Sequence, residues 1–226
     1  VVNNGAALTI NSTYLDLTNA TFDRLFRGSL TLNGGADLVV NGPFGWTMSG
    51  SVTMNGGSVI GGQPIIVRGA IDANGAGNAI TPNAAFDPTS SVMLTNAGDA
   101  LTLSGMVTYA GGTFSGNGAL VQNGNALVQF SPTLINVGRF DWDGASTNTT
   151  TINDNGRFLI NVGELGNGDN SYKGDVDIGF NAQLQVVTAA PWTLQGEISN
   201  NGGINYGTQI INEGVIRGFG VLGSGV

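Results

Sequence analysis

The sequence of 226 residues predicts an all-β fold, a parallel β-helix (β-solenoid) that forms a single domain over residues 1–226. Three observations lead to this prediction. An Asn-Gly signature recurs about every 20 residues, a short run of alternating polar and apolar residues follows it, and 38 glycines weaken any helix. A period of this length is typical of stacked repeats, and the chain is long enough for about ten coils.

The repeat is marked by its turn residues. Five segments read Asn-x-Gly-x-apolar, namely 55–59, 136–140, 161–165, 200–204 and 212–216. One turn glycine can be assigned to each unit, at Gly34, Gly56, Gly75, Gly98, Gly118, Gly138 and Gly156, with intervals of 22, 19, 23, 20, 20 and 18 residues. Glycine and asparagine accept positive φ, so the markers are expected where the chain turns sharply.

Between the turns, the sequence predicts short strands with one buried face. Polar and apolar residues alternate in 7–10, 29–32, 51–54, 100–103 and 183–186. A short helix competes only in 14–27, because no other stretch carries apolar residues at helical spacing together with a cap. Irregular excursions are expected near 12–28, 75–91 and 166–174, where the period is interrupted.

The size of the repeat selects the topology. A unit of about 20 residues cannot bury its apolar face alone, so neighbouring units must stack. Antiparallel hairpins in a meander or propeller would suit the Asn-Gly turns, but a propeller blade needs about 40 residues, twice this period. Parallel coils are therefore favoured. At about 4.8 Å per coil, ten or eleven coils would form a rod about 50 Å long.

These features resemble a known group of proteins. The Asn-x-Gly-x-apolar coils, the glycine and asparagine content and the absence of cysteine are similar to those of bacterial surface β-helix proteins, namely filamentous haemagglutinin-like adhesins and autotransporter passenger domains. The resemblance implies a right-handed parallel β-helix at the cell surface, outside the cell, with an adhesive, matrix or scaffold role. No translocator barrel, secretion domain or cell-wall anchor is recognisable in the sequence.

Composition agrees with an exported rod. Only 10% of the residues are charged, and the chain has neither cysteine nor histidine, so disulfides, thiol chemistry and the usual catalytic triads are excluded. The formal net charge of -8 and the pI near 4.1 argue against nucleic acid as a partner. No apolar run approaches the length of a membrane span, so membrane insertion is not expected.

Both ends of the sequence look like parts of repeats. Residues 1–8 begin in mid-repeat without a signal sequence, and 218–226 still carry the Gly-apolar pattern, which indicates a mature or excised segment. Neither end shows the polar cap that a solenoid normally needs. The sequence therefore predicts either a segment of a longer fibre or subunits that stack head to tail, with the chain itself as the partner.

The hypothesis of an enzymatic function depends on two acidic pairs, Asp141-x-Asp143 and Asp175-x-Asp177. Residues i and i+2 of a strand face the same side, so each pair can place two carboxylates together in solvent for acid–base chemistry on a polysaccharide. Basic partners nearby in sequence are Arg139, Arg157 and Lys173. Solvated acids that keep a rod of low charge soluble are the favoured interpretation, so no residue is assigned as catalytic. A polysaccharide lyase or hydrolase is the alternative.

Other candidate sites have simpler structural explanations. The segments 153–156 and 169–171, with Asp175 and Asp177, supply oxygen ligands of the kind that calcium prefers, but their spacing matches no calcium loop and solvated turns are favoured. No metal or other cofactor is therefore assigned. The indoles of Trp46, Trp142 and Trp192 are expected in the core rather than on sugar rings.

Glycans are considered both as binding partners of the chain and as a covalent modification of its asparagines. Sequons begin at Asn11, Asn19 and Asn148, and 146–151 is the better candidate for sugar attachment. The recurring asparagines have a structural role that needs no ligand, because stacked amides form ladders and satisfy turn carbonyls. The predicted function is a non-enzymatic, extracellular structural or adhesive solenoid, with surface glycans as a second class of partner.

Overall fold

The chain is a parallel β-solenoid of about nine turns with a spacing of about 21 residues. The computed structural model describes all residues except 1–6, 12–13, 17–24, 42–44, 145–147 and 225–226. Within this part of the chain every regular element is a strand, and every strand pairing is parallel. The predicted fold class is confirmed, and the hairpins of a meander or propeller are excluded for the described strands.

Each coil carries up to three strands, which pair with their equivalents in the coils before and after. We call the resulting ladders stacks I, II and III. Stack I contains β1 (Ala7–Asn11), β4 (Ser29–Asn33), β7 (Ser51–Asn55), β10 (Ala70–Asn74), β13 (Ser91–Leu94), β16 (Gly112–Gly116), β19 (Thr133–Asn136), β22 (Arg157–Asn161) and β26 (Gln183–Val187). Stack II contains β2 (Tyr14–Asp16), β5 (Asp37–Val39), β8 (Ser58–Ile60), β11 (Asn78–Ile80), β14 (Ala100–Leu103), β17 (Ala119–Gln122), β20 (Arg139–Asp141) and β23 (Glu164–Leu165).

The third ladder completes each coil. Stack III contains β3 (Leu25–Phe26), β6 (Trp46–Met48), β9 (Ile65–Val67), β12 (Ala84–Phe86), β15 (Val107–Tyr109), β18 (Ala126–Val128), β21 (Thr149–Ile152) and β25 (Asp175–Ile178). Two long strands, β28 (Glu197–Gly207) and β30 (Val215–Ser224), continue stack III with their first halves and stack I with their second halves. A short ladder of β24 (Ser171–Tyr172), β27 (Trp192–Leu194) and β29 (Ile210–Asn212) follows where stack II ends.

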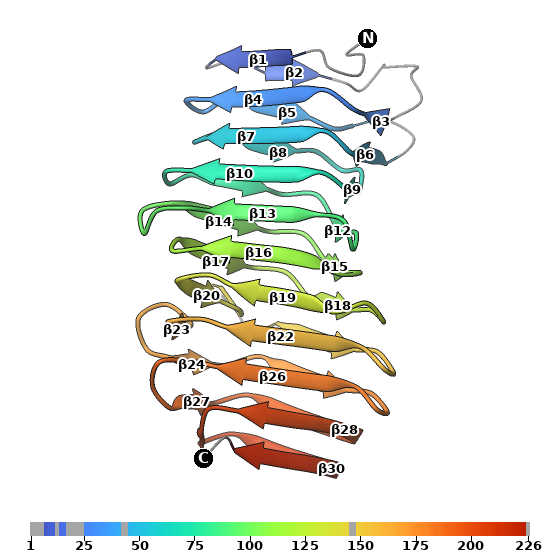
Figure 1. Ribbon diagram of the computed structural model, residues 1–226, viewed down its shortest axis with the longest axis vertical. Coiled ribbons are helices and arrows are strands. Elements are labelled where there is room, and N and C mark those ends of the chain that lie inside the picture. Colours follow the sequence, from blue (N-terminus) through green and yellow to red (C-terminus); the bar gives the residue numbers. More distant parts are fainter. Residues whose placement is uncertain (1–6, 12–13, 17–24, 42–44, 145–147, 225–226) are drawn as a thin grey trace.

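The winding is right-handed, as the resemblance implied. In Figure 1 the arrows of stack I run from right to left on the near side, while the chain advances from the N-terminus at the top to the C-terminus at the bottom. The chain returns on the far side through stack II and reaches stack III at the right. This is the hand expected of parallel strands joined by crossovers.

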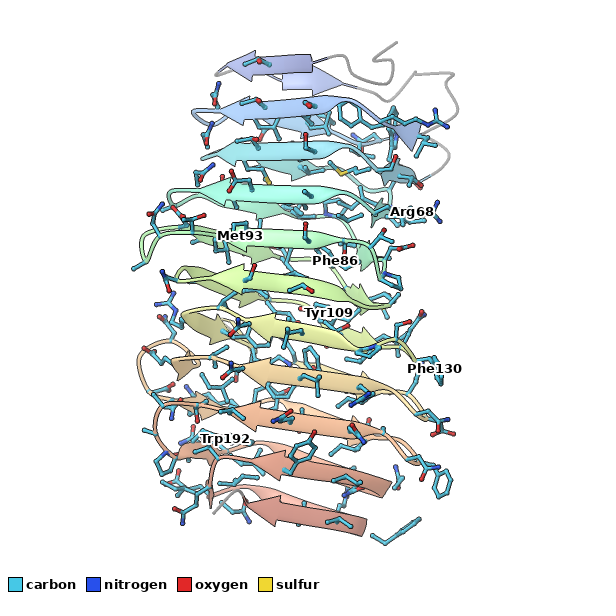
Figure 2. The ribbon with its side chains drawn as sticks, in the orientation of Figure 1. Arg68, Phe86, Met93, Tyr109, Phe130 and Trp192 are labelled. Atoms are coloured by element: carbon cyan, nitrogen blue, oxygen red, sulfur yellow. The ribbon has the colours of Figure 1, made fainter. Side chains whose placement is uncertain are left out.

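The alternating pattern forms the core because every second side chain of a strand faces inward. In β7 the side chains of Val52 and Met54 are buried, and they stack in register on the buried Leu30 and Leu32 of β4. The same repetition produces one continuous core from Leu30 to Ile198. Figure 2 shows Phe86 and Tyr109 inside the solenoid, whereas Arg68 and Phe130 point away from it.

Asparagine ladders run along the axis where stack I ends, as predicted. The Asn55 side-chain amide donates to Asn33 Oδ1 at 2.6 Å, and that of Asn74 donates to Asn55 Oδ1 at 3.1 Å. A second amide contact joins Asn161 to Asn136 Oδ1 at 3.1 Å. The buried Asn78 side chain satisfies turn groups, because its amide donates to three backbone carbonyls while its Oδ1 accepts the Gly56 N–H at 2.7 Å.

Three sequence assignments need correction or restriction. Residues 75–91 are regular, since β11 and β12 lie within them and pair on both sides. Gly156 precedes the stack I strand β22, whereas the other marker glycines follow a stack I strand. The glycine equivalent to Gly138 in the next coil is therefore Gly163, and the interval between the two is 25 residues. Of the expected helix and excursion in 12–28, residues 12–13 and 17–24 lie outside the described part, and the rest contains the strands β2 and β3.

Candidate functional site

The segment 166–174 is the irregular part of the fold that the sequence predicted. Here β23 ends stack II, the chain forms a turn with Gly166 and Gly168 at positive φ, and β24 begins the second ladder. Asn170 fixes the turn, because its Oδ1 accepts the Leu165 N–H at 2.9 Å and its amide donates to the Pro191 carbonyl at 2.7 Å. Irregular connections on a rigid scaffold are where binding residues usually lie.

The acidic pair Asp141 and Asp143 lies beside this turn. Both side chains are buried, with exposed fractions of 5% and 6%, so the expectation that they face solvent is wrong. The core residues Phe140 and Trp142 alternate with the two acids, so Asp141 and Asp143 share the side away from the core, and the segment 166–174 lies against that side. Asp143 Oδ2 accepts the Lys173 backbone N–H at 2.7 Å, which fixes the end of the irregular segment to the preceding coil.

Burial sets the protonation of both carboxyls. It raises the pKa of Asp141, and the neighbouring charge of Asp143 raises it further, against the opposing charge of Arg139. Burial also raises the pKa of Asp143, although the Lys173 N–H bond opposes this. Within the described residues, Asp141 Oδ1 and Arg139 Nε are buried without a hydrogen-bond partner. The pair is therefore an energetically unfavourable place for negative charge at neutral pH.

Asp169 completes the cluster, in a different environment. Its side chain pairs with the half-exposed Lys173 ammonium at 3.2 Å, and its Oδ1 accepts the Ser171 N–H at 3.2 Å. The hydrogen bond with the Ser171 side chain is the largest of several that hold the pKa of Asp169 below its usual value. The cluster thus contains one carboxyl whose pKa is lowered, Asp169, and two whose pKa is raised, Asp141 and Asp143.

The second acidic pair belongs to a solvated surface. Asp175 is exposed and Asp177 is half-buried on the outer face of β25, where they pair in register with Thr149 and Thr151. On the other side they align with Glu197 and Ser199 of β28. Arg157 joins neither pair, because its Nε donates to Gln183 Oε1 at 3.0 Å on stack I. The structure therefore brings Arg139 and Lys173, but not Arg157, to the acids.

The residues considered as calcium ligands cap turns. Asp154 Oδ1 accepts the Phe180 N–H at 2.8 Å, and Asn155 adopts the left-handed conformation at φ +59°. Asp169 caps its own turn through Ser171. In the described residues no group of three or more acidic, histidine or cysteine side chains is arranged to hold a metal ion.

Two tryptophans and one sequon are internal. The indoles of Trp142 and Trp192 are buried, as predicted, while Trp46 is partly buried against the core. Asn148 is also buried, and its amide donates to the backbone carbonyls of Gln122 and Trp142, so the folded chain does not present it for glycosylation. The side chain of Asn11 and all of Asn19 lie outside the described residues, as do residues 146 and 147 of the 146–151 run.

A buried polar network beside the acidic cluster was missed by the sequence analysis. The Tyr109 hydroxyl donates to Gln122 Oε1 at 2.7 Å inside the core. Asn148 then links the Gln122 backbone to that of Trp142, and the Trp142 indole N–H donates to Thr150 Oγ1 at 3.1 Å. A glutamine at an inward position of an apolar strand was the available signal, because buried polar groups are usually hydrogen-bonded; here Oε1 accepts from Tyr109, while Nε2 has no partner among the described residues.

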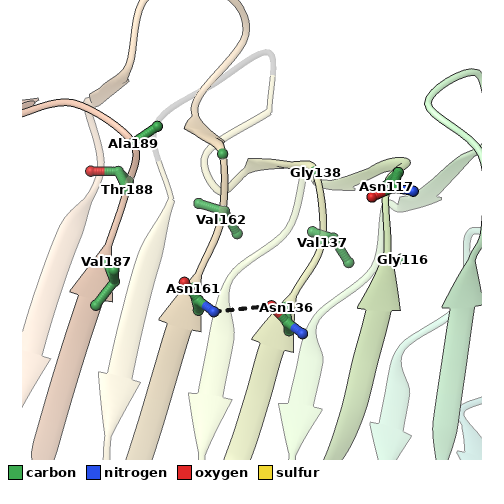
Figure 3. Close-up of a pocket in the computed structure, with 11 residues that line it drawn as sticks. Gly116, Asn117, Asn136, Val137, Gly138, Asn161, Val162, Val187, Thr188 and Ala189 are labelled. Atoms are coloured by element: carbon green, nitrogen blue, oxygen red, sulfur yellow. Dashed lines mark hydrogen bonds between the residues drawn. The ribbon is translucent and has the colours of Figure 1, made fainter.

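Two of the open grooves on the described part of the surface lie at corners between the stacks. The larger, of about 610 Å³, lies at the corner where stack I leads into stack II, and Figure 3 shows the Asn136–Asn161 hydrogen bond in its wall. Its lining also includes Asn117, Gly138 and Thr188 and carries no charged side chain. The smaller groove, of about 440 Å³, lies where stack III leads into stack I and is lined by residues that include Asp154, Asp177 and Asn201.

Comparisons with protein-family models, curated proteins and solved structures found no match to this chain. A helix of the length and apolarity needed to cross a membrane is not found in the described residues.

Ionisation of Asp141 should lower the free energy of unfolding, whereas ionisation of Asp99 should raise it. Because the folded-state pKa of Asp141 is raised, its ionisation reduces stability as the pH rises above the usual aspartate pKa, and the full loss is reached above the raised pKa. We expect Asp141→Asn to increase the free energy of unfolding at pH 7 by about 1 kcal/mol, a gain that disappears below about pH 4. Urea unfolding at both pH values measures this effect.

Asp99 is the matched comparison. Its carboxylate accepts the Asn96 N–H at 2.6 Å and the Gly75 N–H at 2.7 Å, and these bonds lower its pKa. The stability that it contributes is present above the usual aspartate pKa and is lost as the pH falls through the lowered value. Asp99→Asn should therefore destabilise the protein at pH 7. Equal effects of the two substitutions at pH 7 would contradict this assignment.

Proposed function

We propose that the chain is an extracellular structural and adhesive β-solenoid that forms part of a fibre. The observation that carries the proposal is the uncovered core of the last described coil. In register with Asn205, whose side chain is 2% exposed, Leu222 of β30 faces inward and is 54% exposed. Ile216 is likewise half-buried where its partner Ile198 is fully buried. One further coil would cover these side chains.

The backbone supports the same extension. Among the described strands, β1 pairs only with β4, and β30 pairs only with β28, so within the described residues each has one edge without a pairing strand. A parallel edge at each end allows a head-to-tail contact that does not close into a ring. The added coil belongs either to a second copy of this chain or to more of the same polypeptide.

Composition supports an exported rod with an adhesive surface. Charged residues make up 10% of the chain, and cysteine is absent, so the fold depends on ladder hydrogen bonds and a stacked core rather than on disulfides. The outer face of stack I carries asparagine, serine and threonine in register, such as Ser29 on Ser51 and Thr31 on Thr53. Polar, uncharged surfaces of this kind suit glycans as a second class of partner.

The alternative of a polysaccharide lyase or hydrolase has weaker support. The raised pKa values of Asp141 and Asp143, with Arg139 and Lys173 nearby, are what acid–base catalysis would use. However, both carboxyls are almost completely buried, and neither lines the two grooves. A catalytic acid must contact its substrate. The burial of both carboxyls therefore favours the structural and adhesive function over the enzymatic one.

Assembly of the purified chain tests the proposal. We expect filaments in electron micrographs and a mass that rises with concentration in light scattering. Leu222→Lys should abolish this growth, because it places a charge on the uncovered core. Val221→Lys is the matched control, since Val221 is the neighbouring residue, is 56% exposed and faces outward with Ile204. A dispersed monomer at high concentration would contradict self-stacking and leave only extension by the same polypeptide.

A further inference from the structure

The corner between stacks III and I carries exposed phenyl rings in the C-terminal coils. Phe180 lies in the turn between β25 and β26 and is 55% exposed, and Phe219 of β30 is 69% exposed. Between them in the stack lies Gly202, at φ +93°. A Cβ atom at this glycine would lie 2.9 Å from the Phe180 ring and 3.1 Å from the Phe219 ring. The two rings therefore flank a bare backbone, and together the three residues form one apolar strip.

The smaller groove adjoins this strip. This groove has a volume of about 440 Å³. Its lining includes Gly179 and Asn201, which immediately precede Phe180 and Gly202 in the sequence. Thr151, Asn153, Asp154 and Asp177 also line it. Asp154 connects the two features directly, because its Oδ1 accepts the Phe180 N–H at 2.8 Å. The strip and the groove are thus built on the same turns of the solenoid, which is a rigid scaffold.

The combination of groups selects the class of ligand. A phenyl face offers an apolar platform, and the adjacent carboxylates, amides and hydroxyl offer hydrogen bonds. Pyranose rings present both kinds of surface, an apolar C–H face and a rim of hydroxyls. An apolar protein partner would instead bury two carboxylates without counter-charges, which is unfavourable. Since the lining contains Asp154 and Asp177 and no basic side chain, anionic glycans are disfavoured too.

We propose that the strip of Phe180, Gly202 and Phe219, with the adjoining groove, binds an uncharged polysaccharide. The sugar rings stack on the phenyl groups, and their hydroxyls donate to Asp154, Asp177 and Asn201. This proposal deepens the adhesive part of the proposed function and rests on it, but it does not depend on self-stacking of the chain.

Retention on neutral polysaccharides is the direct test. The full chain is passed over microcrystalline cellulose and over chitin, with polygalacturonate as the anionic probe, and cellohexaose and chitohexaose are titrated in solution. We expect retention on at least one neutral polysaccharide and none on polygalacturonate. Phe180→Ala should weaken binding at least tenfold, Phe180→Trp should restore it, and Asp177→Asn should weaken it while the fold is kept.

Phe130 provides the matched control. It lies two residues after Val128, just as Phe180 lies two residues after Ile178, and the registers align Val128 with Ile152 and Ile152 with Ile178. Phe130 is 73% exposed but does not line the groove. Phe130→Ala should leave retention unchanged. Retention on neither neutral polysaccharide, preference for polygalacturonate, or equal losses with Phe130→Ala and Phe180→Ala would overturn the proposal. The Leu222→Lys variant, which should not assemble, should still be retained on the neutral polysaccharide. Sugar binding can therefore fail or succeed independently of self-stacking.

Discussion

Replacement of Phe158 by alanine is expected to destabilise the solenoid by about 3–5 kcal/mol. The Phe158 side chain is fully buried on stack I, and its ring centroid lies 5.2 Å from that of Tyr109, 5.6 Å from Trp142 and 6.3 Å from Phe140. Tyr109 belongs to stack III and Phe140 to stack II, so one ring joins all three walls of the core. Its removal would leave a cavity that rigid, hydrogen-bonded coils cannot close.

Equilibrium unfolding in guanidinium chloride measures this loss, and Phe130→Ala is the comparison on the surface. Phe130 is 73% exposed, so its removal should change stability by less than about 0.5 kcal/mol. Because each coil contacts mainly its neighbours, the damage should be local. Amide exchange should accelerate in β19, β22 and β26 before it does so in β4 and β7. A loss below about 1 kcal/mol, or uniform acceleration along the rod, would contradict the central role of Phe158.

The sequence predicted the parts of the fold that depend on periodicity. Alternation in 29–32 and 51–54 correctly gave β4 and β7, because inward residues must stack on inward residues once the coils are in register. The short period also gave the parallel topology. Local turn chemistry was less informative. The same motif marks three different corners. It follows a stack I strand at Asn55-Gly56 and the stack III part of β28 at Asn201-Gly202. At Asn212-Glu213-Gly214 it precedes the stack III part of β30.

The candidate sites could be predicted only in part. Asp141 and Asp143 were identified by their spacing, which does place them on one side, away from the core residues Phe140 and Trp142, but the sequence did not show that the segment 166–174 buries this side. The exposed rings of Phe180 and Phe219 were missed for a related reason. Phe180 occupies a turn, where exposure depends on the coils above and below rather than on the local pattern. Its position between the turn residues Gly179 and Asn181 was the available signal, and the structure places Asn181 at φ +53°.

The second large effect concerns backbone spacing at the corner between stacks III and I, where Gly28, Gly50 and Gly69 stack in successive coils. A Cβ atom at Gly69 would lie 1.8 Å from the Gly50 carbonyl oxygen, and one at Gly50 would lie 1.8 Å from the Gly28 carbonyl oxygen. Gly69 is also held on both sides, since its N–H donates to the Met48 carbonyl at 3.0 Å and its carbonyl accepts the Ser91 N–H at 3.2 Å. Gly69→Ala should therefore destabilise the protein by about 3 kcal/mol.

Gly98→Ala distinguishes this steric effect from a general loss of glycine flexibility. No atom lies within 4 Å of a Cβ at Gly98, and its φ is outside the left-handed region. Alanine there reduces the entropy of the unfolded chain without strain, so thermal unfolding should show a gain of about 0.4–1 kcal/mol. Opposite signs at the two positions would show that glycine fixes the distance between coils at Gly69, whereas similar losses at both would refute that role. Because a methyl group at Gly69 would push apart the coils that carry Gly50 and Ser91, the loss should appear first in the ladder hydrogen bonds of β7, β10 and β13.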